Sequence, residues 1–472
     1  MRTWRTLLGN ERGAALVLSL MMLLTLTGLL LAFISVSALE PQISRNVTDT
    51  ARARYLAEAG IETGFNLLIN TPSFSTALSG ATASAPWVPL VNNATLAGVT
   101  TGGTSAEAAF AGTYSVLVRN DYQNADSAVT GQAAGTSVTP NETMTSDSNN
   151  IVIMRATGSF NGATRMIEVV VRRAPLPPFP GAVNLPGLQA DSFINKTAFD
   201  VDGRDFSCTS SCDNPGSWTA GSGMKYGIAT QTGTQSNVGV SYEARVESAV
   251  SGSSSKQASI KGKHETNGTY TSGLNTIQAD ASLNPTVMQQ YIDAVASYPG
   301  TTILQSTQAC PMQLTGSATP TSTPTVTNGC TGPDGVNQTL DLGTRDNPKM
   351  VYFRGDTDPT SLFTGLTLNS GIKGAGILIV EDGDLKNLGN FQWDGVVIVT
   401  GNYVGSGFMD NSDTLIRGAF VANEKMAGEA SGFFEFYLHS GADSFTIYNS
   451  EQNIEMVRLM RGNTTMTNWR EL

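Results

Sequence analysis

The stretch that decides the fold is AALVLSLMMLLTLTGLLLAFISVSAL, residues 14–39, which contains no charged residue. About 20 residues of helix span the hydrocarbon core of a bilayer, so this run is long enough to cross a membrane. Arg2, Arg5 and Arg12 precede it. Because flanking positive charge stays on the cytoplasmic side, the pattern predicts a single span with a cytoplasmic N-terminus and an exported remainder.

The boundary in front of this run reads Glu11-Arg12-Gly13 and leads directly into Ala14. A secretory signal instead has a shorter apolar region with its small-residue cleavage site behind it. Cleavage after Gly13 would remove the charged leader and leave the apolar helix on the mature protein. The alternative is a signal anchor that is never cleaved, although such an anchor does not require Glu-Arg-Gly in front of its apolar run.

Two motifs mark the first 70 residues. One is Arg12-Gly13-Ala14-Ala15-Leu16-Val17-Leu18, and the other is Ala57-Glu58-Ala59-Gly60-Ile61-Glu62, with Trp469-Arg470-Glu471 as a weaker match near the C-terminus. Together they resemble the type IV pilins, and within them the PilX-like minor pilins. The resemblance implies a prepilin leader over residues 1–13, cut by prepilin peptidase between Gly13 and Ala14, and N-methylation of Ala14. It also implies helix packing through Leu18, Glu58 and Gly60.

Leu18 departs from the pattern of the major pilins, which carry a glutamate at this fifth mature position. Inserting an unpaired carboxylate into the bilayer costs about 2.5 to 3.5 kcal/mol, so leucine is favoured over glutamate in the membrane. Leucine, however, cannot make the contact with a neighbour's N-terminal amine that the glutamate of the major pilins makes in the filament. By resemblance, minor pilins without this glutamate are associated with the filament tip. The tip pseudopilin of type II secretion also lacks it and remains an alternative.

The helix is predicted to continue past the membrane and to occupy residues 14–70 as a whole. Apolar residues recur at spacings near 3.6, including Tyr55, Leu56 and Leu68, and the spacing of Arg54 and Glu58 favours an ion pair. Pro41 is expected to kink or loosen this helix, because proline removes one backbone hydrogen bond.

A pilin-like β domain is predicted over residues 71–174. Residues 112–119 alternate as a strand, and two further strands meet at Asn161-Gly162, a strong signal for a hairpin. A proline-rich linker, residues 175–180, separates this β-meander from the rest of the chain.

The second predicted domain covers residues 181–472 and contains a repeat. Short apolar strands begin at Gly376, Gly395 and Gly418, which predicts stacked parallel coils and hence a β-helix-like solenoid, with a β-sandwich as the alternative. Asn284 and Pro285 are predicted to start a helix in this domain. The fold class is therefore α+β and mostly β, with a long N-terminal transmembrane helix.

All four cysteines lie in this second domain. In an exported protein an even count predicts disulfides, most simply Cys208 with Cys212 and Cys310 with Cys330, although three pairings are possible. Zinc is the alternative for the first pair, but no histidine is close.

An aspartate cluster, Asp200, Asp202 and Asp205, resembles the opening of a calcium loop. No glutamate follows at the required distance, and Asp-Gly turns are common in β proteins. Calcium is thus a possible ligand of these aspartates, and no other cofactor is predicted.

Composition and motifs exclude several functions. The formal net charge is −11, so no basic surface for nucleic acid is expected. Neither His264 nor His439 belongs to a catalytic motif, and no enzymatic activity is predicted.

The sequence predicts a minor pilin that takes part in assembling or priming a type IV pilus, at its tip. The expected partners are the inner membrane, prepilin peptidase, other major and minor pilins, and a PilY-like tip adhesin. The subunit would be a single-pass inner-membrane protein before assembly and part of an extracellular pilus afterwards. A tip adhesin that binds a surface or glycan is the alternative from another functional class.

Overall fold

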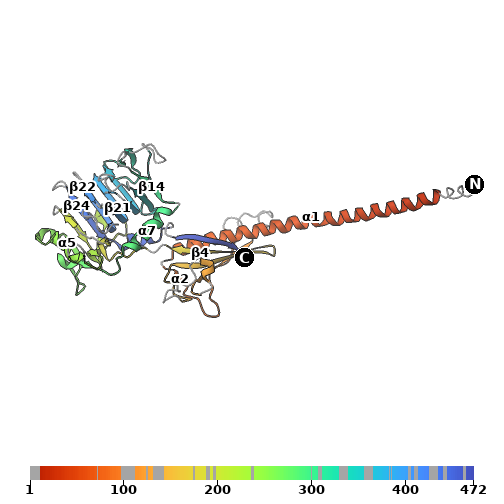
Figure 1. The fold of residues 1–472 in the computed structure, drawn as a ribbon, viewed down its shortest axis with the longest axis horizontal. Coiled ribbons are helices and arrows are strands. Elements are labelled where there is room, and N and C mark those ends of the chain that lie inside the picture. The colour runs from red at the N-terminus through yellow and green to blue at the C-terminus, as the bar shows by residue number, and fades with distance from the viewer. Residues whose placement is uncertain are drawn as a thin grey trace, which may run out of the picture. The chain divides into compact units, whose positions relative to one another are not determined.

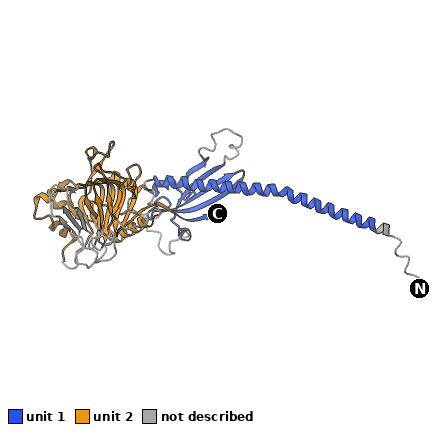
Figure 2. Cartoon of the chain, turned by 90° about the horizontal axis from the view of Figure 1, so that it is seen from above, with its two compact units in different colours: residues 1–171, 466–472 blue, residues 172–465 orange. Residues whose placement is uncertain are grey.

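The computed structural model describes residues 11–71, 73–96, 112–123, 126–130, 143–173, 176–187, 192–194, 198–234, 239–298, 300–306, 311–328, 338–355, 365–381, 383, 385–401, 405–408, 413–424, 434–438, 444–460 and 464–472. The chain divides into two compact units (Figure 2). Unit 1 comprises residues 1–171 and 466–472, and unit 2 comprises residues 172–465.

Unit 1 begins with a helix of 59 residues, α1 (Glu11–Ile69), about 90 Å long at 1.5 Å per residue (Figure 1). It is the one helix of the described chain that is long and apolar enough to cross a membrane. The side chains from Ala15 to Val47 are all exposed. The helix continues through Pro41 and does not end there, and the kink expected at this residue stays a prediction.

The sheet of unit 1 has the strand order β1-β2-β3-β4-β26. Its strands are β1 (Val88–Ala94), β2 (Thr113–Asn120), β3 (Ile151–Phe160), β4 (Ala163–Arg173) and β26 (Thr464–Glu471), with short helices α2 (Phe74–Ala77) and α4 (Ser127–Thr130). Asn161 and Gly162 form the turn between β3 and β4 with φ values of 48° and 85°. Two consecutive positive φ values are typical of a type I′ turn, so the predicted hairpin is confirmed.

The C-terminal half of α1 packs on this sheet through small residues. A Cβ atom on Gly60 would lie 3.1 Å from Ala156 Cβ, and one on Gly64 would lie 2.6 Å from the Met154 sulfur. The sheet contributes Gly158, where a Cβ would lie 2.1 Å from the Ala53 carbonyl oxygen. Helix and strand therefore approach more closely than larger residues would permit. Tyr55 does not belong to this face, because it is 67% exposed.

The last strand, β26, corrects the predicted domain boundary. It lies beside β4 in the sheet of unit 1, whereas the sequence analysis placed residues up to 472 in the second domain. The Arg470 Nε donates to Glu168 on β4 at 2.7 Å, and Glu168 also accepts from Arg155. Because Glu168 is buried, these charge-assisted bonds hold the C-terminal strand in place. Unit 2 is thus inserted between β4 and β26.

Unit 2 contains two large sheets of mostly parallel strands. The first follows the order β12-β11-β7-β25-β23-β21-β19-β17-β14, with β5, β10 and β13 beside this path, and the second follows β16-β15-β18-β20-β22-β24-β6. From β17 to β25, successive strands alternate between the two sheets. Each pass therefore advances the chain by one strand position, which is the path of a coil. The earlier segment β6–β7 pairs with β24 and β25 and adds one further pass.

The strands of the first sheet are β5 (Gly181–Leu185), β7 (Phe199–Asp202), β10 (Tyr226–Thr230), β11 (Ile260–Lys263), β12 (Tyr270–Ser272), β13 (Ile277–Ala279), β14 (Thr302–Gln305), β17 (Lys349–Arg354), β19 (Ile372–Glu381), β21 (Phe391–Gly401), β23 (Asp413–Glu424) and β25 (Ser444–Asn449). Those of the second are β6 (Ser192–Ile194), β15 (Gln313–Thr315), β16 (Thr325–Asn328), β18 (Leu366–Asn369), β20 (Leu385–Leu388), β22 (Gly405–Phe408) and β24 (Phe434–Leu438). The hairpin β8 (Arg204–Ser207) with β9 (Thr219–Met224) stands apart as a sheet of two strands.

The predicted glycine repeat lies in register across three neighbouring strands. Gly376 on β19 faces Gly395 on β21, which faces Gly418 on β23. These glycines have φ values of 116°, 136° and 148°. Only glycine adopts this region freely, so the repeat marks the point where each coil needs an unusual backbone conformation.

The apolar residues after these glycines are buried on both faces of the first sheet. Leu378, Val397 and Phe420 belong to the core inside unit 2, whereas Ile377, Val396 and Ala419 belong to a separate cluster with two helices. These helices are α7 (Pro285–Ser297), which Asn284 caps as predicted, and α8 (Glu451–Arg458). The shorter helices are α5 (Tyr242–Ser248) and α6 (Ser254–Ala258), with 3-10 turns η2 (Pro215–Ser217) and η3 (Leu274–Thr276). Burial on both faces explains the uninterrupted apolar runs of these strands.

Candidate functional site

A polar pocket of about 440 Å³ lies within unit 2. It is lined by residues from the disulfide loop, from the turn before β17 and from β19, β21 and β23, namely Ser211, Cys212, Asp213, Gly343, Thr344, Arg345, Asp346, Lys373, Gly374, Ala375, Gln392, Asp394 and Arg417. This volume is in the range of small-ligand sites. The pocket is therefore the candidate functional site of the unit.

At the base of this pocket is a buried ion pair between Asp394 and Arg417. The two residues face each other across β21 and β23, one position before Gly395 and Gly418. Arg417 Nε lies 2.6 Å from Asp394 Oδ1, and Nη2 lies 3.2 Å from Oδ2, so the pair is bidentate. Only 4% of the Arg417 side chain and 7% of the Asp394 side chain are exposed. Burial raises the pKa of Asp394, although the neighbouring Arg417 charge and hydrogen bond act in the opposite direction.

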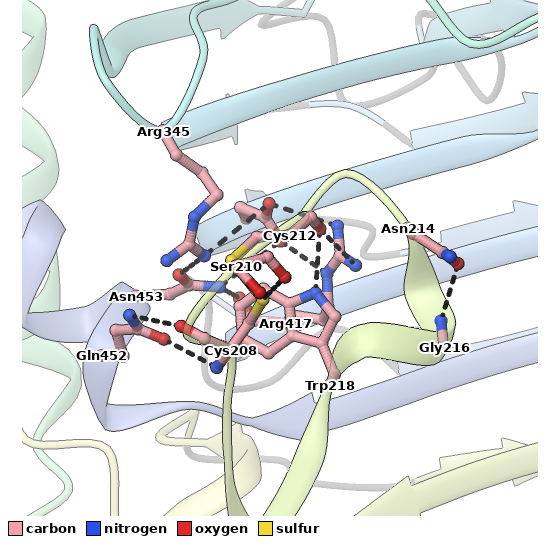
Figure 3. Close-up of a disulfide and its surroundings, with 11 residues drawn as sticks. Cys208, Ser210, Cys212, Asn214, Gly216, Trp218, Arg345, Arg417, Gln452 and Asn453 are labelled. Atoms are coloured by element: carbon pink, nitrogen blue, oxygen red, sulfur yellow. Dashed lines mark hydrogen bonds and ion pairs between the residues drawn. A yellow bond between two sulfur atoms is a disulfide. The ribbon is translucent and has the colours of Figure 1, made fainter.

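A second guanidinium, that of Arg345, lies beside this pair. Its Nη1 is 3.9 Å from Asp394 Oδ2 and donates a hydrogen bond to Asn453 Oδ1. Burial lowers the pKa of Arg345; Asp394 raises it, and the like charge of Arg417 lowers it. The half-buried Arg345 and the buried Asp394–Arg417 pair thus lie together, and the pocket lining also includes Lys373, Asp213 and Asp346. Figure 3 shows the side chains of Arg345 and Arg417 together with Asn453, Trp218 and the disulfide.

A disulfide joins Cys208 and Cys212, and Cys212 lines the pocket with its neighbours Ser211 and Asp213 (Figure 3). Trp218 follows this loop and donates from Nε1 to the Cys212 carbonyl oxygen at 3.0 Å. The Arg417 guanidinium carbon lies 4.6 Å from the Trp218 ring centre, and that of Arg345 lies 4.8 Å from it. The loop is also tied to α8, because Gln452 exchanges two hydrogen bonds with the Cys208 backbone. The predicted pairing of Cys208 with Cys212 is confirmed, while Cys310 and Cys330 lie outside the described residues.

The predicted calcium ligands do not converge. Asp200 pairs with Lys261 at 2.7 Å, and Asp202 pairs with Arg204. Asp205 accepts a hydrogen bond from the Glu451 backbone at the start of α8. No group of three metal-binding side chains occurs in the described part of the chain. Each carboxylate thus has its own cation or amide partner, and the structure corrects the expectation of a shared calcium site.

The remaining predicted positions are spread along α1. Gly13 and Ala14 lie in its first turn, and the Leu18 side chain is 67% exposed. Gly60 faces the sheet, whereas Glu58 pairs with Arg54 at 3.1 Å and is 37% exposed. Arg54 Nε also lies 4.0 Å from Glu471 Oε2 on β26, the edge strand of the sheet. His264 lies in a turn in which its Nδ1 accepts from the Thr266 backbone, and His439 is outside the described residues.

Sequence reasoning missed the buried ion pair, yet the repeat contained its signal. The residues before Gly376, Gly395 and Gly418 are Ala375, Asp394 and Arg417. Equivalent positions in stacked coils are neighbours in space, so opposite charges at two of them predict a cross-strand pair. The contributions of Arg345 and Trp218 could not be found this way, because they come from irregular segments.

Comparisons with known proteins give little further guidance. No family model matches the chain, and no curated protein matches it. Among solved structures, it is similar to the crystal structure of competence-associated pilin ComZ from Thermus thermophilus, with 11% identity over 90% of this chain and 98% of that chain. The TM-score of 0.23 is too low to establish a shared fold.

Proposed function

We propose that this protein is a pilin-like subunit, anchored in the inner membrane through α1 and then incorporated into a type IV pilus. The single observation behind this proposal is the division of α1. Its apolar N-terminal part is fully exposed, while its C-terminal part packs tightly on the sheet of unit 1. An exposed apolar surface of this size requires lipid or other apolar helices around it.

The finer proposal is a minor pilin that primes assembly and occupies the filament tip, without catalytic activity. Leu18 supports this role, because an apolar side chain at this position lacks the carboxylate that would pair with a neighbouring amine. Other pilins, prepilin peptidase and a PilY-like adhesin are the proposed partners. A pseudopilin of type II secretion would have the same helix and is the closest alternative.

The first prediction concerns processing. We expect cleavage between Gly13 and Ala14, followed by N-methylation of Ala14, because the boundary separates a charged leader from the apolar helix. Intact-mass analysis of the protein from its native membrane checks this result. The control is a Gly13→Leu variant, which should keep its leader. A mature N-terminus at Met1, or after a small residue near Ser37, would contradict the proposal.

The second prediction separates assembly from adhesion. Because unit 2 is inserted between β4 and β26, residues 174–463 can be replaced by a short Gly/Ser turn that joins the two strands. We expect this variant to keep a folded unit 1 and to enter pili, because α1 and the whole sheet remain. Electron microscopy with immunogold labelling of unit 1 measures its incorporation, and wild-type label should be confined to filament ends.

The matched control removes residues 174–472 and therefore also β26. It deprives buried Glu168 of its Arg470 partner, so we expect an unstable unit 1 and no incorporation. Intact pili that no longer attach to surfaces would support the adhesin alternative for unit 2. Loss of pili despite a folded unit 1 would contradict assembly through α1 and its sheet.

A further inference from the structure

The pocket in unit 2 places two guanidinium groups beside one buried carboxylate, and its charged lining is completed by Lys373, Asp213 and Asp346. Asp394 is engaged at both oxygens by Arg417, while Arg345 lies 3.9 Å from it and is 19% exposed. Apart from the Nη1 bond to Asn453, the Arg345 guanidinium donates to no side chain in the described part of unit 2. Its remaining N–H groups are therefore available to a partner in the pocket.

A carboxylate fits this guanidinium best. The planar N–H groups of arginine match the two oxygens of a carboxylate, and such charge-assisted pairs are stronger than neutral hydrogen bonds. The Trp218 ring centre lies 4.8 Å from the guanidinium carbon of Arg345 and 4.6 Å from that of Arg417, and these cation–π contacts favour a fixed orientation of both groups.

The rest of the lining is suited to hydroxyl groups. Ser211, Thr344 and Gln392 offer neutral donors and acceptors, and Lys373 with Asp213 forms a loose pair at 3.6 Å on the rim. Asp213 is 85% exposed, and Asp346, the other carboxylate of the lining besides Asp394, is also exposed, so both charges are largely screened by solvent. The lining thus combines one strong position for a carboxylate with several weaker positions for hydroxyl groups.

We propose that this pocket binds a carboxylate-bearing sugar, with Arg345 as the residue that recognises the carboxylate. The inference concerns unit 2 alone and does not depend on the proposed role in the pilus. A sugar acid offers one carboxylate and several hydroxyl groups on a compact ring, which is the pattern that the lining complements.

The experiment is calorimetric titration of the full-length protein in detergent with D-glucuronate. Glucose serves as the neutral sugar, and acetate serves as the carboxylate without hydroxyl groups. We expect glucuronate to bind at least about tenfold more tightly than either, because loss of one charged hydrogen bond reduces affinity by roughly this factor or more. Equal affinity for glucose, or equal affinity for acetate, would overturn the proposal, as would no detectable glucuronate binding.

Variants then test the assigned residue. Arg345→Gln keeps a side chain that can donate to Asn453, and it leaves the Asp394–Arg417 pair intact. It should weaken glucuronate binding roughly ten- to hundredfold. The control Lys349→Gln removes a nearby cation that pairs with Asp341 outside the pocket lining, and it should bind normally. A second variant, Thr344→Trp, should block the pocket without changing its charge. Normal binding by either Arg345→Gln or Thr344→Trp would overturn the assignment.

Discussion

Replacing Asp394 with asparagine is expected to lower the free energy of unfolding of unit 2 by about 3 to 5 kcal/mol. The substitution keeps the shape of the side chain but removes its charge. Arg417, only 4% exposed, would then be buried without a counter-ion. Arg345, whose Nη1 lies 3.9 Å from Asp394 Oδ2, would repel the Arg417 charge once the carboxylate between them is lost. An asparagine amide also presents a donor to the guanidinium, which can only donate.

Amide hydrogen exchange over β21 and β23 of the full-length protein, at increasing urea concentrations, measures this effect without assuming one transition for both units. Glu455→Gln is the matched control, because it makes the same chemical change in an ion pair on α8. Glu455 and Arg458 are 35% and 41% exposed, so this control should cost less than about 1 kcal/mol. A similar cost for both variants would show that the Asp394–Arg417 pair does not stabilise unit 2.

Much of the fold could be predicted because its signals are local. The uncharged run of residues 14–39 predicts an exposed apolar helix, and Asn161-Gly162 predicts the turn between β3 and β4. The spacing of Gly376, Gly395 and Gly418 predicts parallel coils, and these glycines do lie side by side. In each case the conformation depends on a few consecutive residues or on a strict period.

The path of the chain between the units could not be predicted in this way. β26 pairs with β4 although almost 300 residues separate them, and no local pattern encodes that partner. β26 also lacks the alternation of buried and exposed residues that marks a half-buried strand, since most of its residues after Thr464 are exposed. The weak match at Trp469-Arg470-Glu471 was the one available signal, and its arginine proves to be the partner of Glu168.

The helix face shows a different limit. The periodic pattern assigned Tyr55 and Leu56 to the same buried side, although adjacent residues on a helix point about 100° apart. The sheet packs on the side that carries Gly60 and Gly64, where an added Cβ would lie 3.1 Å from Ala156 and 2.6 Å from Met154. Gly158 of the sheet lies against Ala53 and Ala57 of the same helix face. The buried side thus combines small residues at the closest contacts with the apolar side chains of Leu56, Phe65 and Leu68.

Replacing Gly395 with alanine is expected to destabilise unit 2 by about 3 kcal/mol or more. Gly395 has a φ of 136°, which alanine rarely adopts. Its added Cβ would also lie 2.0 Å from the Gly376 carbonyl oxygen, which accepts a hydrogen bond from the buried Trp393 indole at 3.1 Å. The methyl group therefore cannot be accommodated unless the backbone of the neighbouring coil moves.

The control is Gly252→Ala, at a turn where an added Cβ meets nothing within 4 Å. Because its backbone does not require positive φ, this variant should be neutral or slightly stabilising. Hydrogen exchange at residues 396–399 distinguishes the two outcomes, since Gly395→Ala should abolish the protection of this central strand. Retained protection in Gly395→Ala would mean that the coils tolerate a side chain there. The glycine repeat would then reflect sequence similarity between the coils and not a steric requirement of their stacking.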